Sequence, residues 1–269
     1  MEKARVLFVE QAIMPYLKET PMSRIGRYLP QGIQEKGKEI RTFMPRFGNI
    51  NERRNQLHEV IRLSGMNLII NDTDHPLIIK VASIQQARMQ IYFIDNEDFF
   101  HRKFTIRDKA NKFYTDNDER SIFFSRGVLE TVKKLGWGPD IVHCHGWISA
   151  LVPLYVKRAY KDNPLFSDSK VIYSVYNDDF SEGFRKDFDK KIKLPGITAK
   201  DLKYYKDANY VSLTKAAIEY ADAVIMGSET INPELEAYIN TLNKPVLPFQ
   251  PADNYIDAYN EFYDSLLGK

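Results

Sequence analysis

Short apolar runs alternate with longer amphipathic stretches along this chain, and this alternation narrows the choice of fold more than any other feature. Residues 5–9, 171–175 and 223–226 are apolar runs of strand length, and stretches with helical spacing lie between such runs. Strands separated by helices form βαβ units, whose neighbouring strands run parallel. The pattern predicts one α/β domain with a Rossmann-like, doubly wound and mostly parallel sheet.

The stretch from Leu57 to Ile94 breaks this alternation. Its apolar runs have gaps between them that are too short for a helix, and they cover residues 60–63, 68–70, 77–81 and 91–94. Strands joined by short connections pair antiparallel, so we expect a mixed β extension of the sheet. The polar and aromatic segment 101–117 has no regular period. It is predicted to be a long surface loop, a kind of segment that often carries function.

Helical spacing predicts helices over residues 22–35, 119–135, 148–160, 210–220 and, with Ser228 as its cap, up to about Leu242. Three prolines from Pro245 to Pro251 predict an extended crossing. An amphipathic helix over 255–267 is then expected to dock on the body of the protein. We therefore expect the chain to be a naturally complete single domain, in which residues 245–269 pack on residues 1–244.

Composition excludes several classes of protein. The formal charge of +2 over 269 residues argues against a nucleic-acid partner, because phosphate binding needs a concentrated basic surface. The single cysteine, Cys144, cannot form an intramolecular disulfide and is consistent with a reducing cytoplasm. The first apolar run is too short for a membrane span or the core of a signal peptide. The composition indicates a cytoplasmic protein that binds neither nucleic acid nor membranes.

The segment 139–153 contains the first candidates for a functional site. It is predicted to be a buried strand that ends at His145 and turns directly into a helix, with Trp147 in the turn. In open α/β sheets, ligands bind at the carboxyl ends of strands, so both side chains are candidates for a cleft. An interior position for His145, and packing of Trp147 against the next helix, are the alternatives. His143, Cys144 and His145 lack further ligands at metal spacing, and no metal site is predicted.

Several blocks, in order from about Arg5 to Leu242, resemble the amino-terminal half of the bacterial ADP-glucose-dependent glycogen and starch synthases. These blocks are Met44-Pro45-Arg46-Phe47-Gly48, Tyr92-Phe93-Ile94-Asp95-Asn96, Phe123-Phe124-Ser125-Arg126 and Tyr220-Ala221-Asp222. The resemblance implies half of a two-domain GT-B glycosyltransferase that transfers glucose from ADP-glucose to an α-1,4-glucan without a further cofactor. It implies donor-side roles for Lys18, His145 and Asn177. It also implies glucan-side roles for Tyr114, Asp116, Asn117, Arg120 and Trp147.

The sequence departs from the family pattern on the donor side. The family's Lys-Thr-Gly-Gly-Leu is represented by residues 18–22, Lys-Glu-Thr-Pro-Met, and its His-Asp-Trp-His by residues 145–148, His-Gly-Trp-Ile. Tyr176-Asn177 stands where the family has His-Asn, and the family's second domain has no counterpart. Glycine loops bind phosphate through backbone N–H groups, and proline has none. We therefore expect transferase activity that is impaired or that depends on a protein partner supplying a second domain. A non-catalytic glucan-binding or regulatory protein, or an oligomeric scaffold without a ligand, are the alternatives.

Overall fold

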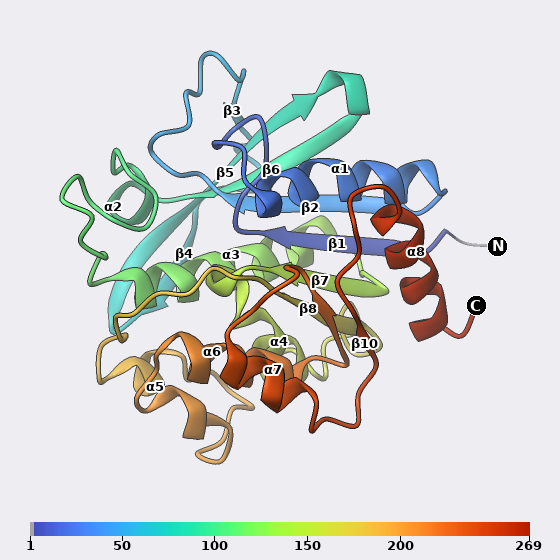
Figure 1. Cartoon of the computed structure of the whole chain (residues 1–269). Coiled ribbons are helices and arrows are strands. Elements are labelled where there is room, and N and C mark those ends of the chain that lie inside the picture. Colours follow the sequence, from blue (N-terminus) through green and yellow to red (C-terminus); the bar gives the residue numbers. More distant parts are fainter. Residues whose placement is uncertain (1–2) are drawn as a thin grey trace.

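A ten-stranded, mostly parallel sheet runs through residues 3–269, the part of the chain that the computed structural model describes (Figure 1). The strands are β1 (Arg5–Glu10), β2 (Glu39–Pro45), β3 (His58–Glu59), β4 (Met66–Ile70), β5 (Thr73–Ile84), β6 (Met89–Asp95), β7 (Ile141–His145), β8 (Lys170–Val175), β9 (Ala223–Met226) and β10 (Val246–Leu247). Their order is β10-β9-β8-β7-β1-β2-β6-β5-β3, with β4 paired to β5. The predicted doubly wound sheet is confirmed.

The order of the strands reverses beside β1. Strand β1 pairs parallel with β2 on one side and with β7 on the other, and Glu10 lies opposite His145 in that second register. Chain connections on the two sides of this point lead away in opposite directions, which opens a crevice at the carboxyl ends of β1 and β7. The topology thus marks this edge of the sheet as the place for a ligand.

The mixed extension is also confirmed, with one local correction. Strands β4, β5 and β6 pair antiparallel in sequence order, and only the β2–β6 pair continues the parallel part. The run at 60–63 is not a strand, because residues 61–63 form a turn in which the Leu63 N–H donates to the Val60 carbonyl at 2.8 Å. The strand that pairs with β5 is β3, just before this run.

Helices cover both faces of the sheet (Figure 1). They are α1 (Pro21–Glu35), α2 (Glu97–Phe100), α3 (Asn117–Leu135), α4 (Val152–Leu154), α5 (Phe188–Lys191), α6 (Tyr210–Tyr220), α7 (Pro233–Ile239) and α8 (Tyr255–Leu266). The predicted helix 148–160 is instead a 3₁₀ turn, the short α4 and a π-helical turn in succession. None of the helices within residues 3–269 is long and apolar enough to cross a bilayer.

Ser228 does not cap a helix, which corrects the predicted start of α7. The helix begins at Pro233, where the missing N–H of proline costs nothing, and the Asn232 side chain accepts the Glu234 N–H. Ser228 lies earlier, just after β9, and its hydroxyl accepts the Asn177 N–H at 3.0 Å. This bond ties the loop after β8 to the loop after β9, at the carboxyl edge of the sheet.

Helices α1 and α8 together cover one face of the sheet. Tyr259 and Tyr263 of α8 are buried against Phe8 of β1 and its neighbours. At the edge of this packing, Lys38 Nζ donates to Asn260 Oδ1 and forms an ion pair with Asp264 Oδ1, at 2.7 Å each. The helix thus docks on the body through an apolar face and a polar edge, and the opposite face of the sheet is packed by α3, α4 and α6.

Candidate functional site

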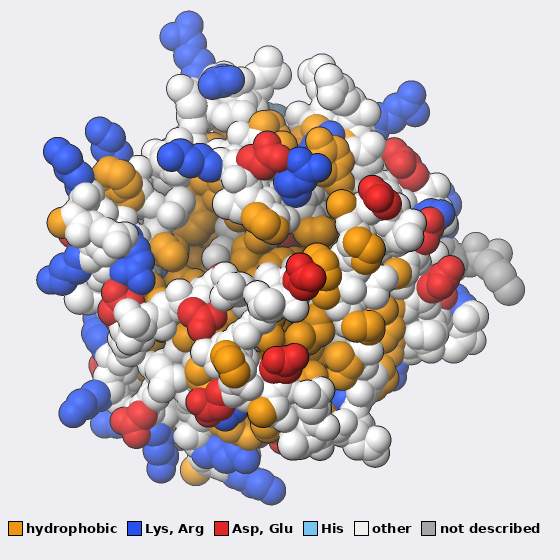
Figure 2. Space-filling view, in the orientation of Figure 1, with side chains coloured by type: hydrophobic (Ala, Val, Ile, Leu, Met, Phe, Trp, Pro, Cys, Tyr) orange, Lys and Arg blue, Asp and Glu red, His pale blue; other side chains and the backbone are white. Residues whose placement is uncertain are grey.

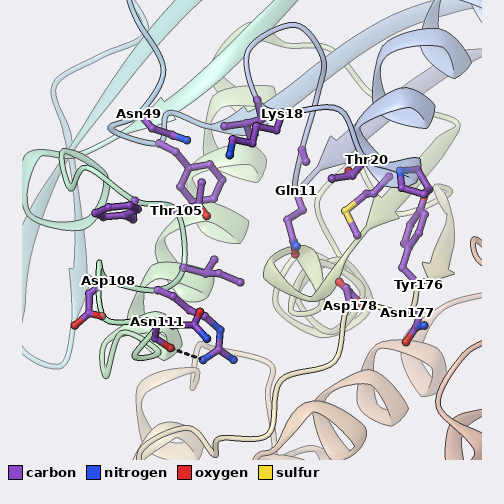
Figure 3. A pocket seen from close by; sticks show the side chains of 18 of the residues that line it. Gln11, Lys18, Thr20, Asn49, Thr105, Asp108, Asn111, Tyr176, Asn177 and Asp178 are labelled. Carbon is purple, nitrogen blue, oxygen red and sulfur yellow. Dashed lines mark hydrogen bonds between the residues drawn. The ribbon is translucent and has the colours of Figure 1, made fainter.

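A cleft of about 720 Å³ opens at the carboxyl edge of the sheet, beside the point where the strand order reverses (Figure 3). Its floor comes from residues that directly follow β1, β8 and β9, and its walls come from the start of α1 and from the loop 104–111. The polar lining combines the amides and hydroxyls of Gln11, Thr20, Asn49, Thr105, Asn111, Asn177 and Ser228 with the charged side chains of Lys18, Arg107, Asp108, Lys109 and Asp178. The uncharged groups outnumber the charged ones, and such a lining is suited to hydrogen-bonding a polar ligand.

The space-filling view supports this description of the cleft. Figure 2 shows apolar side chains gathered around the hollow in the middle of this face, whereas most Lys and Arg side chains lie toward the rim. Two aromatic side chains, Phe47 and Phe104, line the cleft, and Phe104 is 38% exposed. The cleft therefore combines exposed ring surface with hydrogen-bonding groups.

The start of α1 faces the cleft, but its own side chains occupy its N–H groups. The Ser23 N–H donates to Thr20 Oγ1 at 3.1 Å, and the Thr20 N–H donates to Ser23 Oγ at 2.8 Å. Pro21 has no N–H to offer. This capping box stabilises the helix, and it takes up donors that a helix start otherwise presents to an anion. Glu19 pairs with Arg24 at 2.5 Å on the exposed surface.

Gln11 links the loop after β1 to the turn after β7. Its backbone N–H donates to the His145 carbonyl at 3.1 Å, and its side-chain oxygen accepts the Ile148 N–H at the same distance. Gly146 makes this approach possible, because it has φ +80° and a Cβ there would lie 2.6 Å from Gln11 Oε1. The glycine that replaces the family's aspartate is therefore part of a close-packed turn.

Asp178 is the carboxylate on the cleft floor. It accepts the Trp147 N–H at 3.2 Å, and the Tyr210 hydroxyl lies 2.7 Å from its other oxygen. Burial raises the pKa of Asp178 to about 6, although these two hydrogen bonds favour the charged form. The cleft thus gains a negative charge near neutral pH.

Replacing Asp178 with Asn is expected to remove a pH dependence of stability. The pKa of Asp178 is higher in the folded chain than its ordinary value of 3.8. Its stabilising contribution is therefore complete below about pH 4 and is lost as the pH rises through about 6, by at most about 3 kcal/mol. Urea unfolding from pH 4 to 7 should show wild-type stability falling relative to Asp178→Asn. An equal pH slope in both proteins contradicts this expectation, and Asp168→Asn, at an exposed position away from the cleft, is the control.

Of the predicted donor-side residues, Lys18 and Asn177 line the cleft and His145 does not. His145 is fully buried beneath the floor, where its Nδ1 lies 2.7 Å from the Tyr176 hydroxyl. Tyr176 fits there only because residue 227 is glycine, since a Cβ on Gly227 would approach the tyrosine ring to 2.7 Å. The larger side chain at 176 therefore covers the histidine, which cannot touch a ligand in this structure.

Trp147 is likewise buried, as the packing alternative predicts. Its ring packs edge-on against Phe180 at 5.1 Å between centroids, and Phe113 and Phe184 complete an aromatic cluster. Large aromatic side chains stabilise such clusters by burial and by ring geometry. Trp147 thus fixes the wall behind the cleft and offers no stacking platform.

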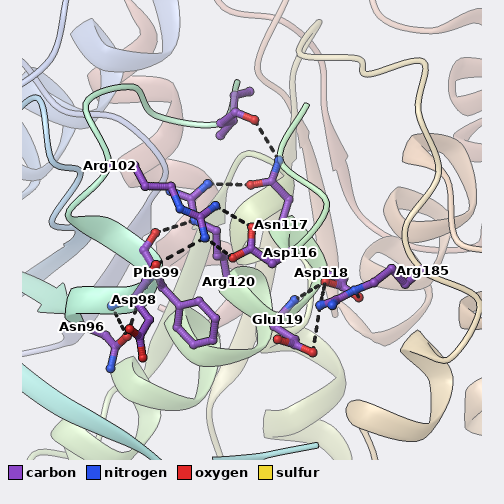
Figure 4. A network of polar contacts seen from close by, with 11 residues as sticks. Asn96, Asp98, Phe99, Arg102, Asp116, Asn117, Asp118, Glu119, Arg120 and Arg185 are labelled. Atoms are coloured by element: carbon purple, nitrogen blue, oxygen red, sulfur yellow. Dashed lines mark hydrogen bonds and ion pairs between the residues drawn. The ribbon is translucent and has the colours of Figure 1, made fainter. Parts of the chain in front are cut away.

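The four remaining glucan-side candidates, Tyr114, Asp116, Asn117 and Arg120, form a clamp at the start of α3, and Figure 4 shows the last three of them. Arg120 is fully buried, and it donates to the Phe99 carbonyl at 2.8 Å and to Asn117 Oδ1 at 2.5 Å. Its guanidinium also lies 5.3 Å from the centre of the Tyr114 ring. Asp116 pairs with Arg102 from the preceding loop. These contacts pin the ends of the loop that forms one wall of the cleft.

A second contact holds the same loop across the cleft. Arg107 donates to both carboxylate oxygens of Glu182, at 2.6 and 2.9 Å. This bidentate pair connects the loop 101–116 to the segment after β8, and it leaves Arg107 with its charge compensated. Lys18 has no such partner among the ion pairs of the described residues. No three His, Cys, Asp or Glu side chains within residues 3–269 come together to hold a metal ion.

Comparison with known proteins shows which family this chain belongs to. The family model described as the starch synthase catalytic domain matches residues 5–241. The chain belongs to this family. A glycogen synthase from Chlorobium limicola is 38% identical over 174 residues, which are 64% of this chain and 36% of that protein. A glycogen synthase from Chlorobaculum tepidum is 33% identical over 248 residues, 91% of this chain and 49% of that protein.

A solved structure shows the same fold. The catalytic domain of Starch Synthase IV from Arabidopsis thaliana, bound to ADP and acarbose, has a TM-score of 0.73 at 17% identity. The match covers 92% of this chain and 51% of that chain. This member of the starch synthase family thus spans from about a third to about half of the relatives it matches, and the resemblance that the sequence blocks indicate is confirmed.

Proposed function

We propose that this protein binds an α-glucan in the cleft and has lost the tight binding of a nucleotide-sugar donor. The main support is the capping box at the start of α1. The N–H groups of Thr20 and Ser23 are already bonded there, and Pro21 has none, so few N–H groups remain to bind a diphosphate. The amides, hydroxyls and rings of the lining remain suited to a sugar chain. The family supports the choice of glucan, since the solved relative is bound to acarbose as well as ADP.

Titration calorimetry with two ligands tests this proposal. We expect maltoheptaose to bind, and ADP-glucose to bind at least about tenfold more weakly, a difference of about 1.4 kcal/mol. Asn111→Ala, in the cleft wall, should weaken binding of maltoheptaose, and Asn243→Ala, on the exposed surface far along the chain, should leave it unchanged. Binding of ADP-glucose without maltoheptaose binding contradicts the proposal.

Restoring N–H groups at the start of α1 should recover affinity for the nucleotide. We expect the double variant Thr20→Gly, Pro21→Gly to bind ADP about tenfold more tightly than wild type, because one hydrogen bond to a charged group contributes about 1.5–3 kcal/mol. Pro21→Ala restores the N–H without glycine's freedom and separates the two effects. Calorimetry with ADP provides the measurement. Unchanged affinity in both variants would mean that the start of α1 is not the cause of weak nucleotide binding.

A partner-completed transferase is the second candidate. Lys18 and Asn177 still line the cleft, and the chain spans only half or less of its synthase relatives. In this case a separate polypeptide supplies the second domain, and glucose passes from ADP-glucose to the glucan. Purified chain should then transfer no labelled glucose from ADP-glucose to glycogen alone, and transfer should appear when the partner is added. Transfer by the chain alone, absent in Lys18→Ala, contradicts both candidates.

A further inference from the structure

A fully buried carboxyl group lies beneath the cleft floor. Glu10, the last residue of β1, is fully buried, and neither of its oxygens has a hydrogen-bond partner among the described residues. The His145 Nε2 atom is also buried without a partner, and it lies 3.5 Å from Glu10 Oε1. Buried polar groups are nearly always hydrogen-bonded. One proton between Glu10 Oε1 and His145 Nε2 would give both of these buried atoms a partner.

The surroundings of Glu10 disfavour a charged carboxylate. The titratable groups that face it are one imidazole of β7, three tyrosines and a thiol: His145, Tyr176, Tyr259, Tyr263 and Cys144. Helix α1 contributes Gly26, whose Cβ position lies 3.1 Å from Glu10 Oε2. None of these groups is a permanent cation. A carboxylate here would be a buried charge without a fixed counter-charge, which is costly.

The two histidines are also best neutral. Their rings lie 3.8 Å apart, so two imidazolium charges would repel each other. His143 is held by the Tyr263 hydroxyl at 2.6 Å and by Ser174 Oγ at 2.7 Å. Burial raises the pKa of Glu10 well above its ordinary value and lowers the pKa of His145 to about 3. Both directions agree with a pair in which neither partner is charged.

We propose that Glu10 is a positioning residue, whose neutral carboxyl group donates to His145 Nε2 and thereby fixes His145 as the Nδ1–H tautomer. His145 Nδ1 then donates to the Tyr176 hydroxyl, 2.7 Å away. Tyr176 accepts this bond, and its own proton is then available for a second acceptor in the buried layer, since the side chain is only 2% exposed. In the other tautomer, the Tyr176 hydroxyl would donate its proton to His145 Nδ1 instead.

Nitrogen NMR of the histidine side chains tests the tautomer directly in the intact chain. In wild type we expect His145, assigned by its loss in His145→Gln, to carry a proton on Nδ1 and none on Nε2 from pH 5 to 8. Glu10→Gln should keep this tautomer, because its amide N–H can donate to Nε2. Glu10→Met has no donor and should shift His145 toward Nε2–H. Protons on both ring nitrogens in wild type, or on Nε2 alone, would overturn the proposal.

A second measurement covers the case in which Glu10→Met does not fold. The neutral carboxyl of Glu10 has a folded pKa above its ordinary value of 4.5. Its contribution is thus present below that pH and is lost as the pH rises through the folded pKa. The melting temperature of wild type should therefore fall relative to Glu10→Gln between pH 5 and 8. A constant difference over this range would mean an ionised Glu10 and would overturn the proposal.

Discussion

Ending the chain after Pro251 is expected to abolish cooperative folding. Helix α8 supplies Tyr255, Tyr259 and Tyr263, all of which are buried, and it covers the face of the sheet beside α1. Burying one large apolar side chain stabilises a protein by about 1.5–3 kcal/mol, so three of them approach the whole stability of a typical domain, about 5–15 kcal/mol. Circular dichroism during heating should show no cooperative transition in the truncated chain.

The control for this truncation is Tyr263→Phe. This variant keeps the buried ring and removes only the hydroxyl that contacts His143, so it should fold and lose about 1 kcal/mol. A truncated chain that melts at the wild-type temperature would contradict the importance of α8. A large loss in Tyr263→Phe would shift the main contribution from apolar packing to the hydrogen bond.

Replacing Arg120 with Met is expected to lower the free energy of unfolding by about 2–6 kcal/mol, because two buried acceptors each lose their donor at about 1–3 kcal/mol apiece. The change leaves the Phe99 carbonyl and the Asn117 side chain without their donor. Because the same residues pin the loop that lines the cleft, proteolysis of the loop 101–116 should become faster. Urea unfolding and limited trypsin digestion provide the two measurements.

Arg102→Met serves as the matched control, because Arg102 belongs to the same clamp through its ion pair with Asp116 but is about one-third exposed. Exposed ion pairs contribute about 0–1 kcal/mol, so we expect a loss in that range. Equal losses of unfolding free energy in the two variants would show that the burial of Arg120 does not add to its stabilising contribution. A small loss in Arg120→Met would return this residue to the candidates for glucan binding.

The parts of the fold with strong local patterns could be predicted from the sequence. The β1–α1–β2 unit has an apolar strand, Thr20 and Pro21 at the helix start, and a strand that ends at Pro45. The broken helix after His145 could not be predicted, because its apolar residues keep helical spacing while the backbone changes from 3₁₀ to π turns. The spacing of apolar residues does not show whether the backbone hydrogen bonds of a turn follow the 3₁₀, α or π pattern.

The site was predicted less completely, because its residues meet only through tertiary contacts. Gln11 and Asp178 were missed, although each directly follows the end of a strand, which was the available signal. The burial of His145 depends on Tyr176 above it and on helix α8, more than 100 residues later in the chain. Arg120 looked like a binding residue because its burial follows from the rings around it, Phe47, Phe100 and Tyr114.

The contact between Tyr176 and Gly227 limits the order in which these two positions can change. A side chain at 227 would meet the tyrosine ring, so glycine at 227 had to precede tyrosine at 176 or arise with it. The reverse path is equally constrained, because a smaller residue at 176 with Gly227 retained leaves an empty space beside the sheet. A directed-evolution library that aims to restore a histidine at 176 should therefore vary 227 in the same clones, since a search at either position alone samples mostly poorly packed proteins.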